Sequence, residues 1–187
     1  MKGTILYCLE ETIIEKYGSE KWDECVIACG YKTGHSFVRM IRDDIDETES
    51  LNVFLKSAET LKMELNELFD IFGEYWCCTY APSLYGAFYV GIMSSKKGIT
   101  KLDWVHDRVT KNIPNARPPR FDFNWITENK LELKYKSERA LIDLFISLIK
   151  GLNKQFNDSC IIRKVSETDL IIEFLDEPGK TEVIYEC

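Results

Sequence analysis

The 187-residue chain holds 24 Lys or Arg against 31 Asp or Glu, a formal net charge of −7, with 45% hydrophobic and 29% charged residues. This composition is typical of a globular protein with one sizeable core, and the acidic balance argues against nucleic-acid binding, because phosphates require a basic face. No run approaches the ~18 apolar residues of a membrane span, and Glu10 and Glu11 interrupt the N-terminal stretch too early for a signal peptide. We therefore expect one cytoplasmic domain over residues 1–187, without membrane insertion.

The helical periodicity of the first two thirds of the chain predicts a series of helices. A first helix is expected over 4–17, and a second is expected to be capped by Ser19 and to end near Gly30. Residues 31–46 are expected to form a loop. Further helices are predicted over 51–58, over 65–76, and from Pro82 to Ile92.

His106 is the most informative residue of the helical part. Gly98 is expected to break the chain before a helix over 99–113, whose apolar stripe consists of Ile99, Leu102, Val109 and Ile113. His106 fills the vacant place on this stripe, seven residues after Ile99. An imidazole that faces a core must be hydrogen-bonded or must bind a ligand. From this helix alone, a hydrogen-bonded core histidine is the favoured interpretation.

Prolines at 114, 118 and 119 end this helical pattern, and alternation with a period of two follows. The pattern predicts a hairpin from 121 to 135, an apolar helix from 141 to 152, and strands near 159–166, 169–175 and 180–186. The fold class is therefore α+β, with a helical N-terminal part followed by an antiparallel sheet of about four strands and one buried helix.

Tyr135, Ser137 and Arg139 alternate along the end of the predicted hairpin. On a strand this spacing places the three side chains on one face, where two hydroxyls and a guanidinium could hold an anion. Alone, the motif is more simply a polar strand face. Together with an inward His106 it suggests a cofactor with one metal and two acidic groups, which describes haem.

The chain resembles the haem-nitric oxide/oxygen-binding family, which is related to the haem domain of soluble guanylate cyclase. The resemblance rests on five segments: Met1–Gly3, Phe72-Gly-Glu-Tyr-Trp76, His106 on its helix, Arg117-Pro-Pro-Arg120 and Tyr135-x-Ser137-x-Arg139. It implies haem b (iron protoporphyrin IX) held between the helical part and the sheet. It further implies His106 as the iron ligand, Tyr135, Ser137 and Arg139 on the propionates, and Pro119 and Ile5 in contact with the haem.

The resemblance also bears on gas selectivity. Members that hold oxygen stably carry a tyrosine five residues after the arginine, where this chain has Leu144, with Leu148 one turn further on. In those members, positions on the first and fourth helices hold polar residues that support the tyrosine. This chain has Leu9 and Trp76 at these positions. These residues predict an apolar pocket that binds nitric oxide and carbon monoxide and excludes oxygen, unless Tyr75, Tyr80 or Trp76 brings a donor to the iron.

The leading hypothesis is a non-enzymatic nitric oxide sensor. The chain leaves no room for an output domain after its last strand, so we expect a signalling partner in trans, a histidine kinase or a cyclic-nucleotide enzyme, switched by loss of the His106–iron bond. Alternatives are an oxygen sensor with a distal tyrosine, and a haem-dependent redox enzyme, for which the only other histidine is His35.

A further hypothesis is a haem-free thiol sensor or interaction domain built on the seven cysteines. The cysteines include no CxxC pair, so a zinc knuckle or a thioredoxin-like motif is not expected. Cys25, Cys29 and His35 are close enough in sequence for a metal site, but buried cysteine is more often a core filler.

Overall fold

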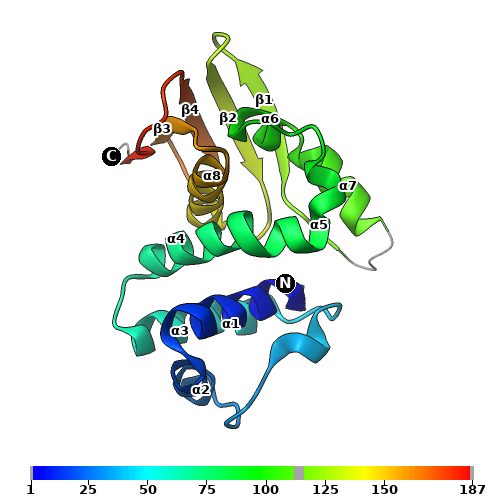
Figure 1. Cartoon of the computed structure of the whole chain (residues 1–187), viewed down its shortest axis with the longest axis vertical. Coiled ribbons are helices and arrows are strands. Elements are labelled where there is room, and N and C mark those ends of the chain that lie inside the picture. Colours follow the sequence, from blue (N-terminus) through cyan, green and yellow to red (C-terminus); the bar gives the residue numbers. More distant parts are fainter. Residues whose placement is uncertain (1, 112–115, 186–187) are drawn as a thin grey trace.

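The computed structural model describes residues 2–111 and 116–185, and it confirms the expected α+β class (Figure 1). The N-terminal helices form one layer, and the sheet with its helices forms the other. No helix in the described part of the chain is both long and apolar enough to cross a membrane. The N-terminal layer consists of α1 (Gly3–Tyr17), α2 (Ser19–Ala28), the short 3₁₀ helix η1 (Phe37–Met40) and α3 (Glu47–Leu61).

Two predictions in this layer need correction. Ser19 does not cap α2; it is the first helical residue, and Gly18, with φ +87°, occupies the cap position. The expected loop 31–46 contains η1, whose Phe37 is fully buried. The buried ring of Phe37 anchors this segment to the core. The polar residues around Phe37 therefore predicted a loop where a short helix forms.

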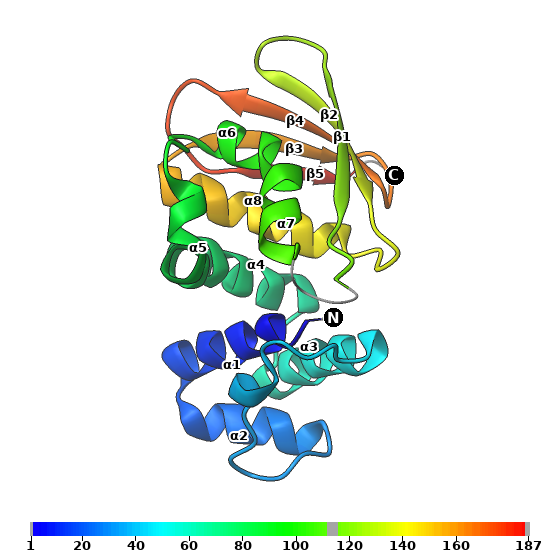
Figure 2. The same ribbon diagram turned by 90° about the vertical axis from the view of Figure 1, so that its right-hand side faces the viewer.

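A long helical segment lies between the two layers (Figure 2). It consists of α4 (Leu65–Tyr75), a π-helical turn η2 (Trp76–Tyr80) and α5 (Ala81–Tyr89), with Pro82 in the first turn of α5 as predicted. A π-turn shifts the side chains that follow it relative to a regular helix. Tyr85 adds a second irregularity, because its backbone (φ −118°, ψ 20°) is not helical.

The expected helix over 99–113 is two helices. Gly98 and the fully buried Ile99 belong to α6 (Ser95–Thr100), and His106 lies on α7 (Leu102–Thr110). The Ser94 hydroxyl caps α6, which explains why Gly98 sits within a helix and does not break the chain. Ile113, also expected on the stripe, lies outside the described residues.

The sheet has five strands in the order β1-β2-β4-β3-β5, which match the two strands of the predicted hairpin and the three segments predicted after it, against an expected total of about four. The first four pair antiparallel, and β5 pairs parallel with β3. Helix α8 covers one face of the sheet, with Ile142, Phe145, Ile146 and Ile149 in a shared core. The elements are β1 (Arg120–Trp125), β2 (Lys130–Lys136), α8 (Ile142–Phe156), β3 (Ser159–Lys164), β4 (Asp169–Leu175) and β5 (Glu182–Tyr185).

Helices α4 and α8 cross at a pair of glycines. A Cβ atom on Gly151 would lie 2.2 Å from the Gly73 carbonyl oxygen, and one on Gly73 would lie 2.4 Å from the Ser147 carbonyl oxygen. Neither position has room for a side chain, so the two backbones touch directly. The crossing sets the spacing between α4 and α8, and both helices contribute side chains to the cavity described next.

Candidate cofactor-binding site

A cavity of about 210 Å³ lies between the two layers, and it contains most of the residues singled out from the sequence. Its wall is largely apolar, and it comes from α1, α4, η2, α5, α7, β1, β2 and α8. The predicted residues in the lining are Ile5, Trp76, His106, Pro119, Tyr135, Arg139, Leu144 and Leu148.

His106 presents one ring nitrogen as a ligand. Its Nδ1 lies 3.1 Å from the carbonyl oxygen of Pro119. A carbonyl only accepts, so Nδ1 carries the proton and Nε2 keeps its lone pair. Burial lowers the pKa of His106, while the bond to Pro119 opposes that shift. At neutral pH the imidazole is therefore uncharged, the form that binds a metal.

The clamp motif is not on a strand throughout, which corrects the expectation. Strand β2 ends at Lys136, opposite Arg120, the first residue of β1, so Ser137 and Arg139 lie beyond the last pair of the ladder. Ala140, with φ +50°, then turns the chain into α8. The Ser137 hydroxyl accepts a hydrogen bond from the Arg139 amide at 3.2 Å, and it is also hydrogen-bonded with the Tyr135 phenol.

Tyr135 is the buried member of the motif, with 5% of its surface exposed. Burial raises the pKa of Tyr135, and a hydrogen bond with Ser137 and the nearby charge of Arg139 oppose that shift. The phenol therefore stays protonated at neutral pH and is a donor toward any anion near Ser137 and Arg139.

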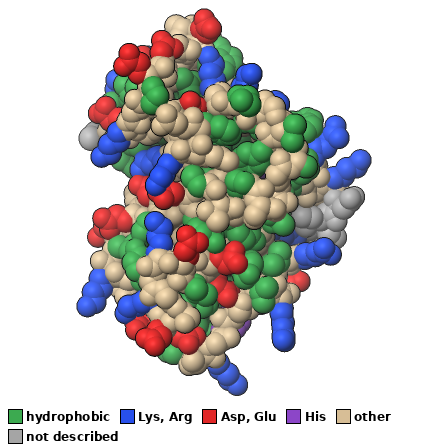
Figure 3. All heavy atoms as spheres, in the orientation of Figure 1, with side chains coloured by type: hydrophobic (Ala, Val, Ile, Leu, Met, Phe, Trp, Pro, Cys, Tyr) green, Lys and Arg blue, Asp and Glu red, His purple; other side chains and the backbone are tan. Residues whose placement is uncertain are grey.

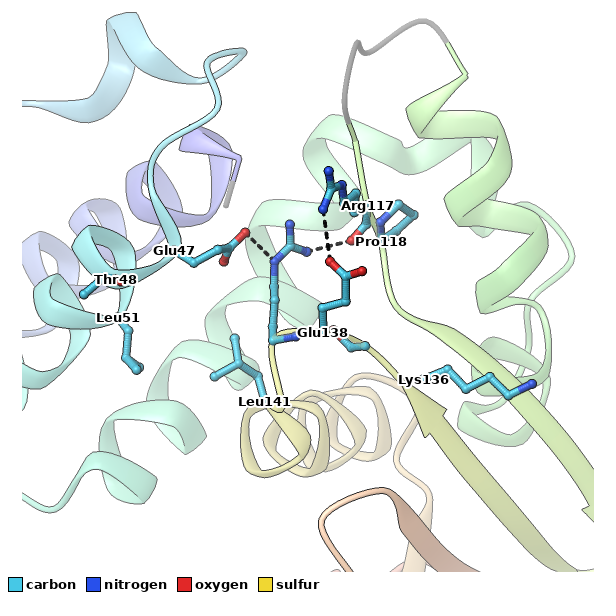
Figure 4. Close-up of a pocket in the computed structure, with 10 residues that line it drawn as sticks. Glu47, Thr48, Leu51, Arg117, Pro118, Lys136, Glu138 and Leu141 are labelled. Atoms are coloured by element: carbon cyan, nitrogen blue, oxygen red, sulfur yellow. Dashed lines mark hydrogen bonds and ion pairs between the residues drawn. The ribbon is translucent and has the colours of Figure 1, made fainter.

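A second, wider hollow of about 670 Å³ adjoins the cavity, and the two share Arg139 and Leu141 (Figure 4). Arg139 donates to a Glu47 carboxylate oxygen at 2.7 Å and to the Arg117 carbonyl oxygen at 2.8 Å. Glu47 belongs to α3, so this ion pair joins the N-terminal layer to the clamp. Ser137 lines this hollow and is absent from the lining of the inner cavity.

The wall formed by α1 and α8 is apolar. Ile5, Leu144 and Leu148 all line it, and Leu144 is 9% exposed. Trp76 also lines the cavity from η2, with its ring stacked on Phe72 at 5.8 Å, and its indole N–H is a hydrogen-bond donor among these apolar side chains. Leu9 is fully buried in the N-terminal core but does not line the cavity. A direct contact of Leu9 with a cofactor therefore remains a prediction.

The two tyrosines suspected from the sequence do not line the cavity, although the Tyr80 ring lies 5.4 Å from the ring of Trp76, which does. Tyr80 shares a 2.9 Å hydrogen bond with the Thr4 hydroxyl, and Tyr75 packs near Glu11 and Glu15. Neither is among the lining residues. Sequence reasoning instead missed Tyr89, at the end of α5, which does line the cavity. No periodicity could have placed it there, because the π-turn and the irregular Tyr85 precede it.

The alternative metal site at Cys25, Cys29 and His35 has no support in the described ranges, where no three His, Cys, Asp or Glu side chains are grouped to hold a metal ion. His35 stacks on Tyr31 with ring centroids 4.1 Å apart, and Cys25 is fully buried. These residues are packed as core and ring contacts, which agrees with the favoured interpretation of buried cysteine.

The cavity and its mouth fit an amphipathic disc such as haem. The inner wall is apolar, a neutral imidazole offers a free lone pair into it, and a guanidinium with two hydroxyls lies at the opening. An apolar macrocycle with one ligatable metal and two carboxylates at its edge matches this distribution of chemistry.

Comparisons with known proteins agree with this fit. The model of the Haem-NO-binding family matches residues 2–164. Among solved structures, a mutant of Cs H-NOX with 4-cyano-L-phenylalanine at site 5 is 25% identical, with a TM-score of 0.81, over 96% of this chain and 99% of that chain. A T. tengcongensis H-NOX mutant is 24% identical, with a TM-score of 0.81, over 96% and 100%.

An oxygen-binding H-NOX domain related to soluble guanylate cyclases, solved as its oxygen complex, is 24% identical, with a TM-score of 0.78, over 97% of this chain and 99% of that chain. At these identities the structural likeness supports the fold, while the family model covers most of the sequence. With its histidine-lined apolar cavity, this chain belongs to the Haem-NO-binding family, the haem gas-sensor domains known as H-NOX.

Proposed function

We propose that this domain is a sensor selective for nitric oxide, which binds nitric oxide and carbon monoxide through haem b and excludes oxygen. We further propose that it acts in the cytoplasm without catalysis of its own. Its signal would pass to a separate protein, a histidine kinase or a cyclic-nucleotide enzyme. The observation that carries the selectivity is the apolar wall of Ile5, Leu144 and Leu148.

Haem supplies an iron that binds diatomic gases once a histidine holds it. Bound oxygen depends on a hydrogen-bond donor much more than nitric oxide or carbon monoxide does. Leu144 and Leu148 carry no polar atom, so they exclude water and donate nothing to a ligand on their side of the cavity. The wall therefore favours the two gases that do not require a donor.

His106 is the residue whose release would carry the signal. Its Nδ1 is tied to Pro119, so the ring orientation is set by the segment that leads into β1. If Nε2 leaves the iron when nitric oxide binds, α7 loses the bond that would hold it to the cofactor, because His106 is the only metal-ligating side chain of the described α7 residues that lines the cavity. The helix and Pro119 can then shift together, which is a change of population between two states.

The alternative of an oxygen sensor is kept because of Tyr89. Its phenol lines the cavity, and no hydrogen bond from it is found in the described part of the chain. Burial raises the pKa of Tyr89, and Cys77 and Cys78 of η2 add to the shift, so its phenol lies near η2 and stays protonated as a hydrogen-bond donor.

The test is the absorbance of the ferrous protein in air, in carbon monoxide and in nitric oxide. We expect complexes with the last two, loss of the histidine-ligated spectrum in nitric oxide, and no stable oxygen complex. A stable oxygen complex that disappears in Tyr89→Phe would replace the proposal with the oxygen-sensor alternative. Steady peroxide turnover by the purified protein would instead favour the redox-enzyme hypothesis.

A further inference from the structure

The outer face of α7 carries a cationic and aromatic stripe. Lys101, Trp104, Arg108 and Lys111 follow one another at intervals of three, four and three residues, which places them on one side of a helix. All four are exposed. Leu102 and His106 lie on the other side and line the cavity. The helix that holds the candidate iron ligand therefore presents a second, different surface to the outside.

The cations of this stripe are available for an outside partner. Lys101 and Lys111, and the nearby Lys97 of α6, form no ion pair within the described residues, and Arg108 lies 5.2 Å from the centre of the Trp104 ring. The one exposed acid on α7, Asp107, is paired with Arg120 at 2.6 Å. The positive charge of the stripe is therefore not neutralised from within α7.

Charge is strongly segregated along the sequence around this stripe. Residues 75–95 contain no charged side chain at all, and residues 96–120 contain seven Lys or Arg against two Asp. The segment 75–120 thus carries a net charge of +5, whereas the rest of the chain carries −12. A charge asymmetry of this size orients the molecule in the field of a negative surface.

Exposed apolar side chains accompany the cations. Val90 is 79% exposed and Met93 is 77% exposed, on the turn between α5 and α6 around Gly91. Trp104 is 47% exposed, and it contacts Phe88 of α5. Figure 2 views this side of the molecule, with α5, α6 and α7 in front of the sheet, and Figure 3 shows Lys and Arg side chains projecting at its margin.

We propose that this side, the α5–α7 face, defined by Val90, Met93, Lys97, Lys101, Trp104 and Arg108, docks on the surface of an anionic lipid bilayer. Lysines near such a surface are attracted to its headgroups, and tryptophan and exposed apolar side chains partition into the interfacial region. The contact is peripheral, and it is separate from the gas-binding cavity.

A bilayer fits these observations better than an acidic protein partner does. Two isolated apolar side chains about four-fifths exposed on a turn do not form the packed, concave patch at the centre of most protein interfaces. An exposed turn with apolar side chains and flanking lysines suits a lipid bilayer, because the apolar side chains can insert between the headgroups. The net charge of −12 outside residues 75–120 would hold the remainder of the molecule away from the same lipids.

The experiment is flotation of the full-length, haem-loaded protein with vesicles of phosphatidylcholine alone or with about one-third phosphatidylserine. We expect binding only to the anionic vesicles, with release at high salt because exposed charges are screened. The double variant Lys97→Ala and Lys101→Ala should weaken this binding about 25-fold, since each cation contributes roughly fivefold.

The matched control is Lys32→Ala with Arg39→Ala, two exposed cations of the N-terminal layer whose removal changes the net charge equally. An unchanged Soret band and melting temperature would show that each variant is folded. Equal loss of binding in both double variants, or no preference for phosphatidylserine, would overturn the proposal. Capture of an acidic amphipathic peptide without vesicle binding would also overturn it, in favour of a protein partner.

Discussion

Replacing Leu144 by tyrosine tests the selectivity proposal most directly. Leu144 is 9% exposed and lines the cavity beside Ile5 and Leu148, so a phenol there enters a dry, apolar environment. A hydroxyl donor contributes ~0.5–1.5 kcal/mol net, and somewhat more at low dielectric. That range corresponds to an oxygen affinity raised about 2- to 13-fold. Carbon monoxide affinity should change much less, because that ligand depends little on a donor.

Leu144→Phe is the control for this prediction. It introduces the same ring volume without the hydroxyl, so the ratio of the two variants isolates the hydrogen bond from the cost of a larger side chain, which is ~1–3 kcal/mol in a packed core. The assay is an oxygen titration of the ferrous protein followed by absorbance. Equal oxygen affinities for the tyrosine and phenylalanine variants would refute the reasoning, as would tight oxygen binding by the unmodified protein.

Three further predictions test the site and its support. His106→Gly should lose the histidine-ligated spectrum and regain a ligated one when imidazole is added; an unchanged spectrum would falsify the ligand assignment. Arg139→Ala, which removes the charge-assisted bonds expected to a propionate, worth ~1.5–3 kcal/mol, should release haem to an apo-globin faster than Ser137→Ala or Tyr135→Phe, which remove neutral bonds worth ~0.5–1.5 kcal/mol; equal rates would show that the clamp is misplaced. Burial raises the pKa of Glu10 above its unfolded value of about 4.3, so the folded state holds this proton more tightly than the unfolded state does. The free energy of unfolding should therefore fall as the pH rises from the unfolded pKa to the higher folded pKa. Glu10→Gln keeps an acceptor for the bond from the Phe37 amide and should remove that fall in denaturant titrations; a parallel pH profile would argue against it.

The regular elements were predictable because their periodicity is strong. The helix expected over 4–17 is α1 at Gly3–Tyr17, and the apolar helix expected over 141–152 is α8. Both bury a wide apolar face, which leaves a clear signal in the sequence. The α+β class and the position of His106 on a cavity-facing side followed from the same kind of pattern.

The irregular elements were not predictable, and they decide the details of the site. The alternation at Tyr135, Ser137 and Arg139 suggested a strand, yet the ladder stops at Lys136 because β1 provides no further partner. Pairing between distant segments is invisible to local spacing. In the same way, the π-turn before α5 brings Tyr89 into the cavity, a position that no regular helix would predict.

The glycine crossing of α4 and α8 has a consequence for how this pocket can diverge. The distance between the two helices is fixed by backbone against backbone at Gly73 and Gly151, which themselves carry no side chain to face the cavity. The frame is thus independent of what the wall residues are. Exchanging Leu144 or Trp76 alters the chemistry offered to a gas while the helices keep their spacing. Gas preference could therefore drift between descendants by single substitutions, whereas the two glycines would be the positions that selection holds constant.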